Sequence, residues 1–192
     1  THIRIQAPSG DQEPYYDDRK NYHSISVQAI CDANGRFLNV VADWPGSVHD
    51  SRILATSTIG TEFASGRRHG LLLGDSGYPC EPWIMTPFLH PTTAAQRRYN
   101  IAHRRTRSVI ERAFGMWKRR FHVLHGEIRM SPVRVCRIVG ACAVLHNIAC
   151  TRQEVNFFDE EIPSQDDVND YLVVGANRQA GKPIGDKFFK IF

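Results

Sequence analysis

The first third of the chain alternates hydrophobic and polar positions in a way that predicts β strands. Residues 1–6 alternate and are followed by a Pro-Ser-Gly-Asp break. Residues 24–31 (SISVQAIC) and 37–42 (FLNVVA) predict two further strands, and the Asp-Ala-Asn-Gly turn between them predicts a hairpin. A helix is expected over 48–55, with Ser47 as its N-cap.

The second third predicts a mixture of strands and helices. Residues 70–74 are apolar without alternation, which is typical of a central strand buried on both faces, and residues 83–86 predict another strand. A helix starts near Ala95, and over 104–121 its apolar residues fall on one arc and its charged residues on the other. A last helix, over 132–150, is expected to be almost wholly buried. Its apolar positions include Val133, Ile138, Val139, Ala141, Val144, Leu145 and Ile148.

This order of elements predicts the fold. Three strands, a helix, a central strand, a further strand and two helices favour an α/β, RNase H-like fold with a mixed central sheet flanked by helices. We expect residues 1–153 to form one domain, truncated at its N-terminus. Residues 154–192 are expected to form an acidic linker and a tail, whose last stretch, 185–192, is apolar and basic enough to dock on the body or on a partner.

Composition narrows the class of protein. Of the 192 residues, 42% are hydrophobic and 23% charged, as expected of a folded domain, and no stretch approaches the roughly 18 apolar residues of a membrane span. The chain has no signal segment and no initiator Met, so we expect a fragment. Its five cysteines are odd in number and lack a Cys-x-x-Cys pair, which favours a reducing compartment, cytosol or nucleus.

Charge divides the chain into two parts. Up to Gln153 there are 20 Lys and Arg against 12 Asp and Glu, whereas the remainder has 4 against 8. A basic body is compatible with a polyanionic partner, although many soluble proteins are mildly basic. Arginine dominates the basic helix, which favours bidentate phosphate contacts over an ordinary solvated face. The series is Arg97, Arg98, Arg104, Arg105, Arg107, Arg112, Lys118, Arg119 and Arg120.

Two carboxylates stand out against this basic background. Asp75 ends the apolar run 70–74, and Glu111 is the single acid between Arg97 and Arg120. Asp75 could simply form a turn, and Glu111 could simply make a solvent-facing ion pair. If the two carboxylates converge, however, they are the ligands that a divalent metal needs for phosphate chemistry. Asp50 is a weaker candidate third ligand, because an acid at a helix start also stabilises the helix dipole.

One further cluster suggests a soft-metal site but favours a structural role. Cys142, His146 and Cys150 share a helix face at i, i+4 and i+8, yet a fourth ligand is lacking and the helix is apolar. Core packing is therefore the preferred interpretation.

Several segments, taken together and in order, resemble the catalytic domain of Harbinger-type DDE transposases and the nucleases domesticated from them. The matching pieces are THI (1–3), DWPGS (43–47) with HD (49–50), LGDSGYP (73–79), MTP (85–87), YN (99–100), AH (102–103), SVIE (108–111), RF (120–121) and VLHN (144–147). The resemblance implies that Asp75 and Glu111 are the second Asp and the Glu of the catalytic triad. The first Asp of the triad would lie two residues before Thr1, outside this chain.

The resemblance also implies a function and its setting. It implies cleavage of DNA phosphodiesters by a two-metal mechanism that uses Mg²⁺ or Mn²⁺. It also implies a separately encoded Myb-like DNA-binding partner and a location in the nucleus, or partly in the cytoplasm. An oligomer is compatible with the resemblance. We expect the basic helix to bind the DNA backbone through Arg104, Arg105, Arg107, Arg112, Lys118, Arg119 and Arg120. The alternatives are a catalytically silent DNA- or protein-binding module of the same fold and a small-molecule phosphohydrolase.

Overall fold

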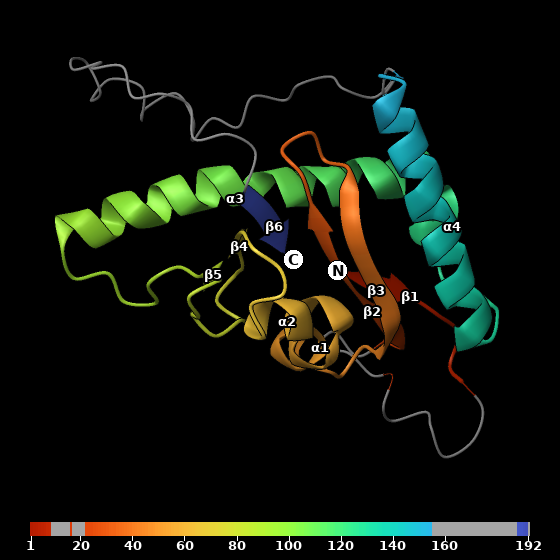
Figure 1. Cartoon of the computed structure of the whole chain (residues 1–192). Coiled ribbons are helices and arrows are strands. Elements are labelled where there is room, and N and C mark those ends of the chain that lie inside the picture. Colours follow the sequence, from red (N-terminus) through yellow and green to blue (C-terminus); the bar gives the residue numbers. More distant parts are fainter. Residues whose placement is uncertain (9–15, 17–21, 155–187, 192) are drawn as a thin grey trace.

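A computed structural model describes residues 1–8, 16, 22–154 and 188–191 of the chain (Figure 1). The elements are β1 (His2–Arg4), β2 (Ser24–Cys31), β3 (Phe37–Pro45), α1 (Asp50–Thr56), α2 (Thr58–Ala64), β4 (Leu71–Leu73), β5 (Ile84–Met85), α3 (Ala94–Arg120), the 3₁₀ helix η2 (His122–Leu124), α4 (Pro132–Thr151) and β6 (Phe188–Ile191). The predicted strands and long helices are present, with ends shifted by a few residues.

The strands join into one mixed sheet. β1 and β3 pair antiparallel with β2 on its two edges, so the predicted hairpin of β2 and β3 is confirmed. β4 pairs parallel with β5, and β6 lies between the two halves, antiparallel to β2 and parallel to β4. The mixed α/β class predicted from the sequence is therefore confirmed. β4 is central, and both of its neighbours run in its own direction.

β1 and β6 share one edge of β2. Ile3 lies opposite Ile25, and the amino group of Thr1 donates to the carbonyl of Val27 at 2.8 Å. Further along β2, Ile191 lies opposite Ile30. Because both strands are antiparallel to β2, they run in the same direction, one after the other along its edge.

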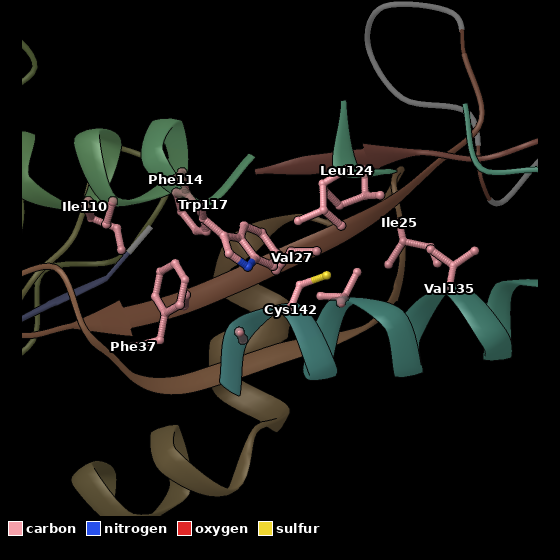
Figure 2. Packing of buried hydrophobic residues seen from close by; sticks show 14 of the residues in the cluster. Ile25, Val27, Phe37, Ile110, Phe114, Trp117, Leu124, Val135 and Cys142 are labelled. Carbon is pink, nitrogen blue, oxygen red and sulfur yellow. The ribbon is translucent and has the colours of Figure 1, made fainter. Parts of the chain in front are cut away.

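The two faces of β2 serve two cores. Ile25, Val27, Ala29 and Cys31 alternate along the strand and belong to the cluster formed with α3 and α4. Figure 2 shows Trp117 of α3 in this cluster beside Phe37 of β3, and their rings are 5.5 Å apart in an edge-to-face arrangement. α3 crosses the strands, and α4 lies beside β3 (Figure 1).

The other core lies beneath α1 and α2. Ile30 from β2 and Leu72 from β4 pack there with Leu54 of α1 and Phe63 of α2, and Tyr78 is buried in the same cluster. The hydroxyl of Tyr78 donates to Gln28 at 3.1 Å, although Gln28 faces this apolar side. The sheet is thus covered on both faces, which fixes the end of β4 at a junction of strands and helices.

The first helical region differs from its prediction. One helix was expected over 48–55 with Ser47 as N-cap, but α1 begins at Asp50 after His49, and a second helix, α2, follows. The hydroxyl of Ser57 accepts a hydrogen bond from Gly60 N at 3.1 Å and caps α2. Ser57, the polar cap between the short helices α1 and α2, therefore divides this region into two helices where the sequence predicted one.

α4 is much less buried than its sequence predicts. Val133 is 65% exposed, Val144 61% and Leu145 52%, while Val135 and Val139 are fully buried. The prediction of an almost wholly buried helix was wrong because α4 packs against β3 and α3 on one side, and the described chain places nothing over the other side. By length and composition α4 is also the one described helix able to cross a membrane, although no stretch of the chain was expected to be apolar enough for that. Its buried face packs within the core, as a core helix does.

The Cys142, His146 and Cys150 face is structural, as preferred from the sequence. His146 is buried, and its Nε2 lies 3.1 Å from the Gly35 carbonyl and 3.4 Å from Cys150 Sγ. Within the described parts of the chain, no group of three His, Cys, Asp or Glu residues is placed to hold a metal ion. This face therefore joins α4 to the turn between β2 and β3.

Candidate metal and nucleic-acid site

Asp75 stands where β4 leaves the buried sheet. A Cβ on the preceding Gly74 would lie 2.9 Å from the side chains of both Ile84 and Tyr78, so only glycine lets the strand pass this close. Asp75 is half-buried, and its Oδ1 accepts a hydrogen bond from Gly77 N at 2.7 Å. The turn-forming role considered from the sequence is therefore confirmed, and the second oxygen of the carboxylate is not part of that turn.

Asp50 and Asp75 converge on the space beside Gly77. A Cβ placed on Gly77 would lie 3.0 Å from Asp75 Oδ1 and 3.9 Å from Asp50 Oδ2. Burial raises the pKa of the Tyr78 hydroxyl, and the negative charges of Asp50 and then Asp75 raise it further. Two carboxylates from different elements, the start of α1 and the end of β4, thus act on one small region.

The start of β1 lies in the same region. Burial lowers the pKa of the Thr1 amino group to about 6; Asp50 opposes this shift, Lys118 adds to it, and Asp75 opposes it. Lys118 donates from Nζ to Thr1 Oγ1 and to the His2 carbonyl, each at 2.9 Å. Lys118 of α3 therefore holds β1 in place beside the two aspartates.

Glu111 is engaged elsewhere. Its Oε1 accepts from Nη2 of Arg107, one turn earlier on α3, and its side chain is 49% exposed. The sequence grouped Glu111 with Asp75; the structure places Asp50 beside Asp75 and joins Glu111 to Arg107, a residue of the cavity that Asp75 lines. A triad that includes Glu111 stays a prediction.

A cavity of about 360 Å³ separates the Asp75 turn from α3. Arg104 and Arg107 face it from the helix, so two of the arginines assigned to DNA lie opposite the Asp75 carboxylate. Its lining residues are Asp75, Ser76, Pro87, Asn100, Ile101, His103, Arg104 and Arg107. A larger hollow of about 480 Å³ lies between β3 and α4, and most of its lining is apolar. We assign the chemistry to the smaller cavity because its charged groups converge.

His103 is a site residue that sequence reasoning missed. It is buried, and its Nε2 lies 3.2 Å from the carbonyl of Met85. Burial lowers its pKa, hydrogen bonding to the backbone of Met85 and Gly74 opposes this, and Arg107 lowers it further. A neutral imidazole thus ties α3 to the ends of β4 and β5, directly behind Asp75. The Ala-His pair in a basic stretch gave no sign of burial.

The remaining basic residues of α3 differ in their surroundings. Arg104, Arg105, Arg112 and Arg119 are exposed, whereas Arg107, Lys118 and Arg120 are half-buried. Arg120 opposes the burial-raised pKa of the Cys150 thiol, which places it toward α4. The DNA-binding role of the whole series stays a prediction. The exposed members can reach DNA without any rearrangement of the side chains around them.

The donor set beside Gly77 suits a hard divalent cation. Carboxylate oxygens are the ligands that Mg²⁺ and Mn²⁺ take in proteins, and the missing side chain at Gly77 leaves room next to both carboxylates. Asp50 and Asp75 therefore fit such an ion as a partial ligand set. The described residues supply no third acidic ligand there.

Known proteins are similar to this chain over most of its length. The human protein "Putative nuclease HARBI1" is 39% identical over 152 residues, covering 77% of this chain and 43% of that protein. The Arabidopsis thaliana "Protein ALP1-like" is 30% identical over 187 residues, covering 88% and 46%. The chain thus spans less than half the length of these curated relatives, and no solved structure matches it.

The resemblance to Harbinger-derived nucleases found in the sequence is confirmed by these relatives. A family model described as DDE superfamily endonuclease matches residues 1–147, which include β1 through most of α4 and all of the cavity-lining residues. The chain therefore belongs to the DDE superfamily endonucleases.

Proposed function

We propose that the chain is the catalytic core of a metal-dependent nuclease that cleaves DNA phosphodiester bonds by a two-metal DDE mechanism. The observation that carries this proposal is the convergence of Asp50 and Asp75 beside Gly77, next to a cavity faced by Arg104 and Arg107. Carboxylates that hold cations and arginines that hold phosphates are the two sets of groups that phosphodiester hydrolysis requires.

We assign an RNase H-like fold to this core. Three antiparallel strands precede a central strand, β4, whose end carries Asp75, and helices cover both faces of the sheet. In such an arrangement the acids of different elements meet at one edge, which is where Asp75 and the start of β1 lie.

Each residue of the site has a distinct part in the proposal. Asp50 and Asp75 bind divalent cations, Mg²⁺ or Mn²⁺, and Arg104 and Arg107 orient the phosphodiester from the opposite wall. When bound, such cations lower the pKa of water and neutralise charge on the leaving oxygen. His103 keeps the end of β4 fixed against α3, so that Asp75 does not move away from the arginines.

A third carboxylate has a place in this geometry. The Thr1 amino group lies within electrostatic reach of Asp50 and Asp75, so a residue joined shortly before Thr1 would lie beside both. Along the β2 edge, Gln28 and Ala29 lie between the partner of Thr1 and the partner of Ile191. An Asp two residues before Thr1, continuing β1 in register, would pair opposite Ala29. Glu111 would join the two aspartates as a ligand once its ion pair with Arg107 is broken.

Metal binding tests the proposal directly. Titration of the chain with Mn²⁺, followed by the electron paramagnetic resonance of the free ion, should show binding that weakens roughly tenfold or more in Asp75→Asn and in Asp50→Asn. Asp43→Asn is the matched control, because Asp43 is exposed on β3. Equal Mn²⁺ affinity in all four proteins would overturn the assignment of the ligands.

The third carboxylate has its own test. A chain with Asp-Gly added before Thr1 should bind Mn²⁺ more tightly than one with Asn-Gly, because the two extensions differ only in charge. In a protein as long as the relatives, Asp75→Asn and Glu111→Gln should each abolish Mg²⁺-dependent nicking of supercoiled plasmid. Nicking that persists in both variants would refute the triad.

A catalytically silent module is the second candidate function. It is favoured by one observation, that the Glu111 carboxylate is ion-paired with Arg107 and is therefore not available to a metal ion in this structure. A silent module would retain DNA without binding Mn²⁺ at Asp75, whereas the nuclease requires both. The same Mn²⁺ titration therefore separates the two functions.

The cellular setting is proposed from the resemblance alone. We propose that the full protein works in the nucleus with a separately encoded Myb-like protein that contacts DNA. Co-expression of the two should shift a fluorescently tagged full-length protein from cytoplasm to nucleus. An unchanged distribution would refute the partner.

A further inference from the structure

The outer face of α3 carries arginines at a regular interval. Arg98, Arg105, Arg112 and Arg119 are seven residues apart along the helix, and all four are exposed. Seven residues make almost two turns, so these side chains form one stripe that drifts by about 20° per step. We call this set the arginine stripe.

The stripe is separate from the candidate active site. Projected at 100° per residue, the buried residues of α3 are centred roughly 145° around the helix from the stripe. They are His103, Ile110, Ala113, Phe114 and Trp117. Arg104 and Arg107, which line the cavity beside Asp75, lie between these two sides. The stripe therefore faces outward, and the residues lining the cavity include none of its members.

The composition of this face is unusual for a solvated helix. α3 has nine Lys and Arg residues and a single acid, Glu111, which is already bonded to Arg107. A surface serving solubility alone mixes both signs. The polar contacts that the structure gives Arg112 and Arg119 are to Ser108 Oγ and the Gly115 carbonyl of the same helix, so neither of these contacts neutralises its charge.

The spacing of the stripe suits duplex DNA. Successive arginines are about 10.5 Å apart and the whole stripe is about 32 Å long, taking 1.5 Å per residue. That length is close to one turn of B-DNA, about 34 Å, and the step lies between the widths of its minor and major grooves, about 6 and 12 Å. Neighbouring arginines can therefore reach phosphates on the two walls of a groove.

We propose that the arginine stripe is a second, sequence-independent DNA-binding surface that anchors the duplex away from the bond being cleaved. It adds Arg98 to the residues expected from the sequence and divides the basic helix into a cavity-facing set and an outward set. The inference rests on the proposed function in taking DNA as the ligand.

The test is the salt dependence of DNA binding. In metal-free buffer, where no cleavage occurs, a duplex longer than one turn is titrated with the full chain while its fluorescence anisotropy is measured at several salt concentrations. Each phosphate contact contributes about 0.9 to the slope of log K against log salt. Replacing the four stripe arginines with Gln should reduce the slope by roughly 2 to 4 and weaken binding more at low salt than at high salt.

The control carries the same change in charge. Arg67, Arg129, Arg134 and Arg137 are exposed and lie outside α3, and their replacement by Gln removes four charges as well. Arg and Gln have similar helix propensity, so circular dichroism should show intact helices. A slope that falls equally in both variants, or in neither, overturns the stripe.

Failure of the stripe and failure of the nuclease are distinguishable. Mn²⁺ binding should be unchanged in the stripe variant, because the stripe lies away from Asp50 and Asp75. If the slope does not change but Asp75→Asn still loses Mn²⁺, the stripe fails alone. If Asp75→Asn keeps Mn²⁺ while the stripe variant loses DNA, the metal site fails and the DNA surface stands.

Discussion

Asn147 on α4 makes a contact whose energetic cost can be worked out from the structure. Its Oδ1 accepts from the N–H of Phe37, and its Nδ2 donates to the carbonyl of the same residue, both at 2.7 Å. Phe37 is the first residue of β3, which pairs with β2 alone among the described strands. The Asn147 amide thus replaces a neighbouring strand at one position and joins α4 to the sheet edge.

Asn147→Ala should destabilise the protein by about 2 to 3 kcal/mol. It removes two hydrogen bonds worth about 1 kcal/mol each, and it leaves the partly buried N–H and carbonyl of Phe37 with only incomplete access to water. Asn147→Asp is a sharper perturbation, because it keeps one acceptor facing the N–H but places a charged oxygen against the carbonyl.

The sign of the pH dependence follows from the chemistry of the introduced carboxyl. Its protonated form can donate to the Phe37 carbonyl, so folding raises its pKa above the ordinary value of about 3.9. The loss of stability in Asn147→Asp should therefore be largest near neutral pH and decrease as the pH falls through the raised pKa.

Urea denaturation followed by tryptophan fluorescence measures these changes. Leu145→Ala is the control, since Leu145 lies two residues away on α4 and is 52% exposed; it should cost well under 1 kcal/mol. A loss below about 0.5 kcal/mol in Asn147→Ala, or a loss equal to that of Leu145→Ala, would refute the reasoning about a strand-like contact.

Three further predictions test other parts of the structure. Trp117 is fully buried and its indole N–H has no hydrogen-bond acceptor in the described chain, so Trp117→Phe should cost about 1 to 2 kcal/mol and Trp117→Ala about 3 to 5 in urea denaturation. Burial lowers the pKa of His103 and of His146 in the folded protein, so as the pH falls the unfolded chain binds protons at these residues before the folded chain does. Thermal melting should therefore show stability falling as the pH drops below about 6.5, and falling less steeply in His146→Gln. Arg107→Gln frees Glu111 from a partly exposed ion pair, so it should change stability by about 1 kcal/mol or less yet increase Mn²⁺ affinity; an unchanged affinity would argue against Glu111 as a ligand.

The main sheet could be predicted because its signals are local. The alternation of β2 and the turn before Phe37 are properties of adjacent residues, and the structure repeats both. The exposure of α4 could not be predicted in this way. Whether Val144 is buried depends on which element covers that side of the helix, and an apolar sequence does not say which one does.

The site shows the same limit more sharply. Asp75 was found because the strand before it is apolar on both sides, whereas Asp50 was only a weaker candidate ligand, because an acid at a helix start also stabilises the helix dipole. Lys118 looked like one more cation for DNA, and only the position of β1 shows that its ammonium holds Thr1. His103 belongs to a segment that matches the family, but nothing local indicated its burial, which depends on β4 and β5 packing against α3.

The sequence of α3 predicted one role, DNA binding, for all of its basic residues, whereas the structure gives the helix three sides with different surroundings. A helix of 27 residues presents three sides along its whole length, and each meets a different environment. Trp117 faces the core, Arg107 faces the cavity beside Asp75, and Arg112 faces outward. Because a substitution on one side leaves the other two in place, core stability, metal binding and DNA retention can be measured separately on this helix. If the three properties fall together in single variants, the division of the helix into three sides is wrong.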